Sequence, residues 1–311
     1  MTQETQNAQH AQTRAALTRF AWLSIAAALV TILLKTGAFL LTGSVGLLSD
    51  AAESIVNLVG AIMALGMLVI AARPPDKSHT YGHSKAEYFS SGVEGMLILV
   101  AVVGILWSSI DHLLHPHPLE QLGLGLVVSI VASLVNLIVA RVLIRAGKQE
   151  NSITLESDGQ HLMTDVWTSL GVIIGVGLVA LTGWNILDPL VAMLVALNII
   201  WTGVQLVRRS VSGLMDAALP ADEQQKIEEV MAKYRGKQVD FHALRTRQAA
   251  SRRFVTVHML VPGSWTVHNA HRFAEDFETD IRAALGEAVI TTHVEPIEDE
   301  LSMRDILLEQ E

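Results

Sequence analysis

The chain has 311 residues, no Cys, 22 Lys and Arg against 31 Asp and Glu, and a mean hydropathy of +0.39. Charged residues make up only 17% of it, against about 25% in a soluble domain. This composition excludes a disordered chain, a disulfide scaffold and a nucleic-acid-binding protein, which needs a basic surface, and it indicates an integral membrane protein.

Charge and histidine content divide the chain into two parts. Residues 1–212 carry 11 basic and 13 acidic side chains, whereas residues 213–311 carry 11 basic and 18 acidic ones and five of the 12 His. We therefore expect a cytoplasmic tail over 1–14, a membrane domain over 15–212 and a soluble domain over 213–311. The lack of Cys excludes thiolate metal sites and thiol redox chemistry throughout.

Six apolar stretches are each long enough to cross the hydrocarbon core of a bilayer, which takes about 20 residues in a helix. They cover residues 15–42, 45–72, 88–110, 122–145, 156–182 and 188–208. We do not expect the first to be a cleaved signal peptide, because it is too long and a second span follows almost directly.

Basic residues lie in alternate connections of these six predicted spans. They are Arg14 and Arg19, then Arg73, Lys77 and Lys85, then Arg141, Arg145 and Lys148, and finally Arg208 and Arg209. The other connections contain no Lys or Arg. Under the positive-inside rule, this pattern predicts that both termini, and with them the acidic domain, are cytoplasmic.

Ionisable residues inside membrane spans are costly to bury and are functional candidates by default. In the second span, spacings of three and four put four polar residues on one helix face: Asp50, Glu53, Ser54 and Asn57. In the fifth span the same spacings align Asp158, His161 and Asp165. Each of these two spans therefore presents one polar face.

Two pairs of side chains at (i, i+4) spacing, Glu53 with Asn57 and His161 with Asp165, can close a four-ligand site. Two carboxylates, one imidazole and one amide oxygen suit a divalent transition-metal ion, and the carboxylates reduce the cost of burying its charge. Because such ligands must be deprotonated to bind a metal, exchange of metal for protons follows.

The alternative is that these groups only hydrogen-bond between helices. We expect that structural role for Asn136 in the fourth span, and we expect Glu94 in the third span to snorkel or to pair near an interface. His115 and His117, in the connection after the third span, are expected to be solvated.

The soluble part has a helical period over residues 221–235 and 266–285 and strand patterns over 238–247, 253–261 and 288–295. The order αββαβ predicts a small α+β domain of the ferredoxin-like type. His293 and Glu295, two residues apart on the last strand, point to one strand face.

Four segments together carry a resemblance to a known family: GSVGLLSDAAES entering the second span, HTYGHSKAE after it, HxxxD in the fifth span and FHALRTRQ in the soluble domain. The chain resembles the cation diffusion facilitators, bacterial divalent metal cation/proton antiporters of the zinc or ferrous-iron efflux type, over nearly its whole length. The resemblance implies a homodimer that is joined through a ferredoxin-like cytoplasmic domain.

Carried over by position, the family's transport site falls on Glu53, Asn57, His161 and Asp165, the four residues reached by spacing. Bacterial zinc members commonly have Asp at both second-span positions, and animal zinc members have His and Asp. The HxxxD pair fits zinc-, iron- or cobalt-type members better than manganese ones. The Glu–Asn pair leaves the choice of ion open among these metals.

The resemblance implies two further metal sites and one charge pair. A site at the cytoplasmic membrane surface falls on Asp76, His79 and His83, for which the alternative is a solvated loop. A binuclear site at the dimer interface falls on His242, His258, His271, His293 and Glu295, for which the alternative is structural or loosely regulatory histidines. Lys85 and Asp216 match a pair that interlocks the membrane and soluble parts.

From these features we expect a secondary transporter of the bacterial inner membrane. It would export zinc, iron, cobalt or a similar ion from the cytoplasm in exchange for protons by alternating access. The chain carries no Walker A motif, so we expect neither a nucleotide partner nor enzymatic activity. A membrane-anchored metal sensor using the cytoplasmic His cluster and a metal channel are the alternatives.

Overall fold

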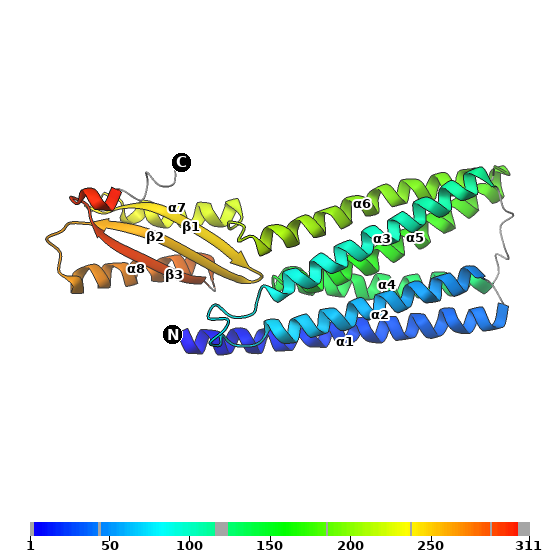
Figure 1. The fold of residues 1–311 in the computed structure, drawn as a ribbon, viewed down its shortest axis with the longest axis horizontal. Helices are drawn as coiled ribbons and strands as arrows, with labels where there is room; N and C mark the ends of the chain where they lie inside the picture. Colours follow the sequence, from blue (N-terminus) through cyan, green and yellow to red (C-terminus); the bar gives the residue numbers. More distant parts are fainter. Residues whose placement is uncertain are drawn as a thin grey trace. The chain divides into compact units, whose positions relative to one another are not determined.

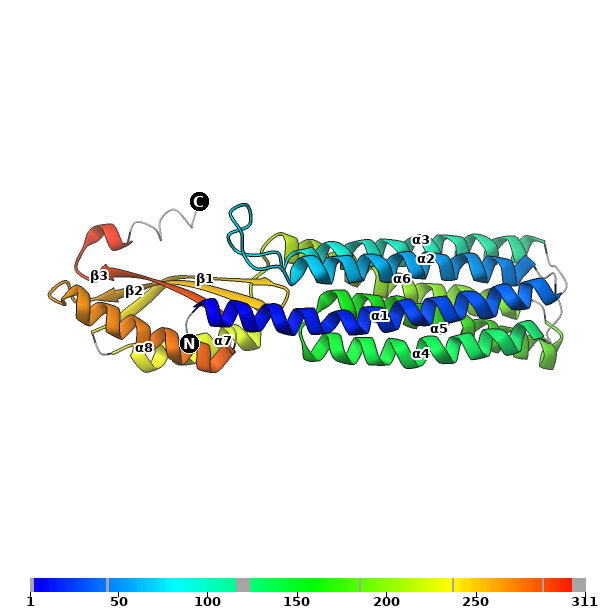
Figure 2. The same ribbon diagram turned by 90° about the horizontal axis from the view of Figure 1, so that it is seen from below.

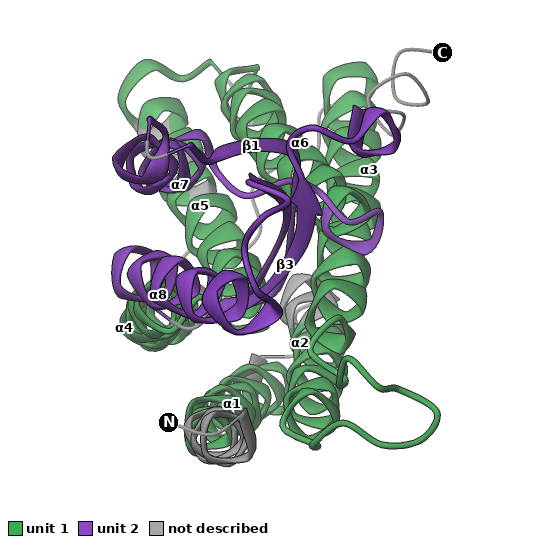
Figure 3. Ribbon diagram, turned by 90° about the vertical axis from the view of Figure 1, so that its left-hand side faces the viewer, with its two compact units in different colours: residues 1–212 green, residues 213–311 purple. Residues whose placement is uncertain are grey.

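A computed structural model of the chain describes residues 3–42, 45–115, 124–184, 186–236, 238–286 and 288–303 (Figure 1). The fold divides into two compact units, residues 1–212 and 213–311 (Figure 3). The fold class predicted from the sequence, a helical membrane part followed by an α+β domain, is confirmed.

The first unit consists of long helices that run alongside one another (Figure 2). Their bounds are α1 Gln3–Thr42, α2 Val45–Ala71, α3 Ala86–Leu114, α4 Leu124–Gln149, α5 Ile153–Thr182 and α6 Leu187–Leu214. Because α1 begins at Gln3, most of the segment expected as a tail, residues 1–14, is helical. The connection that contains His117 lies outside the described residues.

Within the described residues, five helices hold an apolar segment long enough to cross a membrane, namely α1, α2, α3, α4 and α6. The remaining helix, α5, has 30 residues, or about 45 Å at 1.5 Å per residue. Its length therefore suffices for the sixth predicted span. It carries Asp158, His161 and Asp165 in its first half.

Two apolar clusters organise these helices. One contains Leu17, Leu68, Leu143 and Leu155 and joins α1, α2, α4 and α5, and the other joins α3 to α6. Small residues let α3 and α6 approach closely, since a Cβ atom on Gly95 would lie 3.1 Å from the backbone oxygen of Gly203. Such contacts are how helices associate where no water drives their packing.

The second unit has the predicted element order. It comprises α7 Ala221–Tyr234, β1 Asp240–Ala249, β2 Arg252–Val261, α8 Val267–Leu285, β3 Ala288–Pro296 and a short 3₁₀ helix, Glu300–Met303. The sheet has the order β1-β2-β3, with β1 antiparallel and β3 parallel to β2. The parallel pairing requires a crossover, which α8 supplies.

Helices α7 and α8 cover one face of this sheet (Figure 3). Val255, Val257 and Met259 alternate along β2 into the core, where they pack with Phe277 and Ile281 of α8. Because side chains alternate across a strand, the intervening residues of β2 lie on the other face. His258 is one of these, so the histidines of the sheet project away from the helices.

Candidate metal sites

Three of the four residues predicted for a transport site contact one another where α2 meets α5. The Nε2 atom of His161 lies 2.7 Å from Oδ1 of Asn57, and Nδ2 of Asn57 donates to Oδ2 of Asp165 at 2.5 Å. The three residues are 5% (Asn57), 7% (His161) and 8% (Asp165) exposed. Glu53 lies in α2 one turn before Asn57, but its side chain is outside the described residues.

Two more polar side chains contact this group. Asn136 of α4 donates from Nδ2 to Oδ2 of Asp165 at 3.1 Å, and Oε2 of Glu94 on α3 lies 3.4 Å from Nδ1 of His161. The sequence interpretation assigned neither residue to the site. Glu94 is fully buried, so it does not snorkel as one of the two expectations had it. It pairs instead with His161 in the interior of the unit. The sequence feature that could have indicated Glu94 as a site residue was its charge within an apolar span.

This arrangement gathers the donor types that a divalent ion needs. The imidazole of His161 and the carboxylate of Asp165, both on α5, each lie within hydrogen-bonding distance of the amide of Asn57 on α2, His161 at its oxygen and Asp165 at its nitrogen. Such nitrogen and oxygen ligands suit zinc and other divalent first-row ions. A cation bound here would need His161 and Asp165 in their deprotonated forms.

A second group of metal-ligand side chains lies in the connection between α2 and α3. The possible ligand atoms of Asp76, His79 and His83 lie within 4.8 Å of one another. Oδ1 of Asp76 accepts hydrogen bonds from the backbone N–H groups of Ser78 and His79 at 2.8 and 2.7 Å. These bonds, that of His79 foremost, lower the pKa of Asp76 and favour the carboxylate that a metal requires.

The third group lies across the sheet of the second unit. In the strand register His242 pairs with His258, and His258 pairs with His293, so one histidine from each strand stands in a row. A β-bulge follows His242, where Ala243 adopts a φ of 50° and the register shifts. Bulges re-aim side chains next to functional sites.

The carboxylate of Glu295 connects these histidines. Its Oε2 lies 2.8 Å from Nε2 of His242 and 3.4 Å from Nδ1 of His258, whereas its Oε1 lies 3.4 Å from Nε2 of His293. His242, His258 and Glu295 have ligand atoms within 4.8 Å of one another. His293 is 62% exposed at the edge of the group. A bridging carboxylate with different histidines at its two oxygens suits two neighbouring ions.

His271 is not brought to this group within one chain. It lies exposed on α8, the helix that packs on the opposite face of the sheet. Asp216, for its part, accepts a hydrogen bond from Nη1 of Arg247 at 3.2 Å within the second unit. Its predicted pairing with Lys85 would join the two units and stays a prediction.

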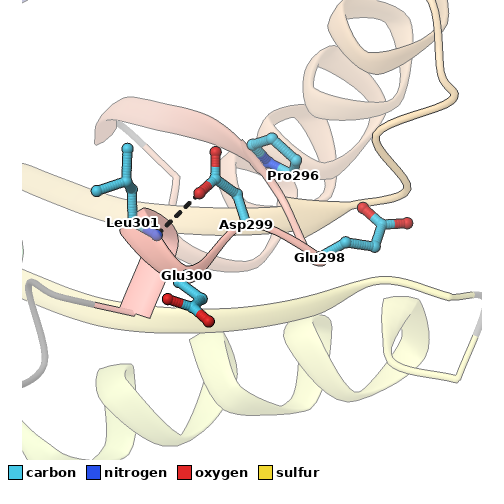
Figure 4. Close-up of a pocket in the computed structure, with 5 residues that line it drawn as sticks. All are labelled: Pro296, Glu298, Asp299, Glu300 and Leu301. Atoms are coloured by element: carbon cyan, nitrogen blue, oxygen red, sulfur yellow. Dashed lines mark hydrogen bonds between the residues drawn. The ribbon is translucent and has the colours of Figure 1, made fainter.

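A shallow pocket after β3 is distinct from the histidine group (Figure 4). It is lined by Pro296, Glu298, Asp299, Glu300 and Leu301. Oδ1 of Asp299 accepts from the backbone N–H of Leu301 at 2.9 Å, and Oε2 of Glu298 accepts from that of Gly263 at 2.9 Å. These carboxylates are therefore engaged in holding the turn.

Two family models match the chain in succession. The model described as the cation efflux transmembrane domain covers residues 21–215, and that of the cation efflux protein cytoplasmic domain covers residues 219–297. Together they span both units of the fold. The candidate residues of the three groups lie within these matched ranges.

Among curated proteins, the chain is 52% identical to a transporter of Synechocystis, sll1263, over 90% of each chain. It is 31% identical to the cation-efflux pump FieF of Shewanella oneidensis, over 89% of this chain and 93% of that protein. The chain is also similar to a solved C-terminal domain of the CzcD transporter from Thermotoga maritima. That match is 22% identical with a TM-score of 0.24 and covers 25% of this chain and 92% of the other.

Proposed function

Because the chain belongs to the cation diffusion facilitator family of cation efflux transporters, we propose that it exports a divalent transition metal from the cytoplasm in exchange for protons. The observation that carries this proposal is the buried contact of Asn57, His161 and Asp165 between α2 and α5. Buried polar residues in a membrane domain mark ion pathways.

The metal ion would bind Oδ1 of Asn57, Nε2 of His161 and a carboxylate oxygen of Asp165, with Glu53 as the fourth ligand. Two carboxylates balance the charge of the dication in the low dielectric of the membrane. Protons would occupy the imidazole of His161 and the carboxylates of Asp165 and Glu53 after the ion has left, because one group cannot bind both. Movement of the helices about this site would expose it to one side of the membrane at a time.

The donor set favours zinc, iron or cobalt as the transported ion. One imidazole with oxygen ligands is typical of zinc sites and acceptable to the neighbouring first-row metals. The neutral oxygen of Asn57 in place of a carboxylate distinguishes this site from that expected of bacterial zinc members. We propose that this position tunes the choice among these ions.

The cytoplasmic groups would bind the same metal in a regulatory or structural role. His242, His258 and Oε2 of Glu295 would hold one ion, and His293 with Oε1 would hold a second. Because α8 covers the other face of the sheet, His271 would contribute from the partner of a homodimer. Asp76, His79 and His83 form a further site whose ligand atoms are already close together.

We further propose that the protein lies in the bacterial inner membrane with both termini in the cytoplasm. The alternation of basic connections supports this orientation. Lys85 and Asp216 would then lie at the same membrane surface and interlock the two units. An exposed ion pair contributes only about 0–1 kcal/mol, so its role would be orientation.

Metal flux into proteoliposomes tests the proposed function. Full-length protein is reconstituted and offered Zn, Fe, Co, Ni, Mn and Cd separately, and the Asp165→Ala variant is measured beside it. The variant should lose transport because it removes one of two carboxylates that balance the ion. Asp111→Ala, which removes an exposed carboxylate near the end of α3, should transport normally. Wild-type flux by Asp165→Ala would refute the assignment of the site.

A further inference from the structure

Glu94 is a buried carboxylate that the proposed transport site does not use. It lies in the third turn of α3, its residue is 0% exposed, and neither carboxylate oxygen has a hydrogen-bond partner among the described residues. A carboxylate without a partner in such surroundings is costly. A purely structural position would be better filled by an apolar side chain of similar size.

His161 faces this carboxylate across the helix interface, and Asp158 of the same helix acts on it electrostatically. Nδ1 of His161, which is also buried and also without a hydrogen-bond partner among the described residues, lies 3.4 Å from Oε2 of Glu94. The other ring nitrogen of His161, Nε2, points to Asn57 at 2.7 Å. The imidazole therefore stands between the proposed ion ligands on one side and Glu94 on the other.

The helix opposite leaves room for Glu94. A Cβ atom on Gly60 of α2 would lie 2.9 Å from Oε1 of Glu94, closer than real Cβ contacts. Only glycine fits at this position without moving the carboxylate. The space beside Gly60 and the ring of His161 together fix where the carboxylate lies.

We infer that Glu94 is a positioning residue for the transport site, one that accepts a hydrogen bond from Nδ1 of His161. A metal ion on Nε2 leaves the ring proton on Nδ1, and a carboxylate there fixes the ring orientation and makes Nε2 a stronger ligand. The inference rests on the proposed transport function. It adds a second-sphere partner to one of its four ligands.

This contact lies across the interface of α3 and α5. Glu94 belongs to α3, which shares an apolar cluster with α6 and also packs against α2 and α5, whereas His161 belongs to α5, which shares a cluster with α1, α2 and α4. The ion ligand is thereby contacted by a side chain from a neighbouring helix. A shift of α3 relative to α5 would change the support of His161.

Zinc flux measured over a range of zinc concentrations distinguishes a positioning role of Glu94 from a role in helix packing alone. In proteoliposomes of the full chain, Glu94→Leu should raise the apparent KM for zinc 10- to 100-fold, the usual loss when a metal ligand loses its outer partner. Glu94→Gln keeps an acceptor oxygen and should restore most of that affinity. A structural role alone would lower the amount of folded protein or the maximal rate and would leave KM unchanged.

A glycine pair provides a test that removes no polar group. Gly60→Ala should displace the carboxylate of Glu94, because that carboxylate is at the end of a flexible side chain. The variant should therefore raise KM for zinc, as Glu94→Leu does. Gly66→Ala on the same helix, where nothing lies within 4 Å of the new Cβ, should leave KM unchanged. This pair keeps the inference testable if Glu94→Leu does not fold.

An unchanged KM for zinc in Glu94→Leu would overturn the inference. If Glu94→Leu does not fold, an unchanged KM in Gly60→Ala would overturn it. Equal losses of zinc affinity in Glu94→Leu and Glu94→Gln would overturn it as well. If Asp165→Ala abolishes flux while these variants are silent, only the role of Glu94 fails. If Asp165→Ala transports like the wild type, the transport site itself is wrongly assigned. The two failures are therefore distinguishable in one set of vesicles.

Discussion

Nε2 of His161 lies 2.7 Å from Oδ1 of Asn57, although 104 positions separate the two residues in the chain. The contact joins the polar face of α5 to that of α2 in the interior of the membrane unit. Asn57 bonds at the same time to Asp165 through its other amide atom. A neutral amide thus stands between the imidazole and the carboxylate of the proposed site.

The first prediction concerns the choice of ion. Asn57→Asp places a second carboxylate beside Asp165 and adds a titratable group to the site, so both the relative rates among Zn, Fe and Co and the pH dependence of transport should change. Initial flux for each ion over a range of pH values measures this. An ion profile and pH dependence identical to those of the wild type would show that Asn57 is not a ligand.

The second prediction concerns metal binding by the cytoplasmic domain. Residues 219–311 contain a complete sheet and core, so this segment should fold alone, and it should bind more than one divalent ion per chain. His242, His258, His293 and both oxygens of Glu295 exceed what one four-coordinate ion needs. Calorimetric titration with zinc gives the stoichiometry.

The control for this measurement is a pair of histidine variants. His258→Ala combined with His293→Ala should lose most binding yet keep the fold, because neither side chain belongs to the core. His268→Ala, which changes an exposed histidine of α8, should bind normally. An unchanged zinc stoichiometry in the double variant would show that these histidines do not bind the metal.

The third prediction concerns association of two such domains. Residues 213–311 carry 18 acidic and 11 basic side chains, and like net charges repel. Bound dications would offset that repulsion, so zinc should tighten the dimer of the isolated domain. Sedimentation with zinc and with a chelator measures the effect. Identical association constants under the two conditions would contradict it.

The fourth prediction is the alkaline stability of the same domain. Burial, and then the neighbouring Asp280 carboxylate, raise the pKa of Tyr234 to about 12, and its hydroxyl donates to Asp280 at 3.2 Å. A pKa raised in the folded state contributes stability below the unfolded value of about 10, and this is lost as pH rises towards 12. Denaturant midpoints should fall across that range.

Tyr234→Phe serves as the comparison. It lacks the phenolic proton, so its denaturant midpoint should depend less on pH between 10 and 12 than that of the wild type. Parallel curves for the two proteins would show that another group causes the alkaline loss.

The sequence predicted the elements of the soluble unit well, because strand alternation and helical period are local signals. The helix expected over 221–235 is observed as Ala221–Tyr234. The first strand, expected over 238–247, is instead Asp240–Ala249. It contains a bulge after His242 that alternation does not encode. Spacing placed His293 and Glu295 on one face, but only the strand register aligns His258 with both neighbouring histidines.

In the membrane unit, spacing identified the polar faces of α2 and α5 because both pairs recur at helical intervals. Spacing describes one helix at a time and does not say which neighbouring helix meets that face. Glu94 has Ser90 and Ser91 at helical intervals, and Asn136 has Ser133, but neither has another ionisable side chain within one turn on its helix face. Their contacts with His161 and Asp165 therefore emerge only from the packing of α3 and α4 against α5.

Coupling between metal and protons is the most direct test of the proposed antiport. Proteoliposomes containing the full chain, with a zinc indicator and a pH indicator inside, are exposed to external zinc with and without an imposed pH gradient. Antiport predicts that an acidic interior accelerates zinc entry and that zinc entry itself raises the internal pH. Zinc entry at the same rate without a gradient, with no change of internal pH, would contradict it.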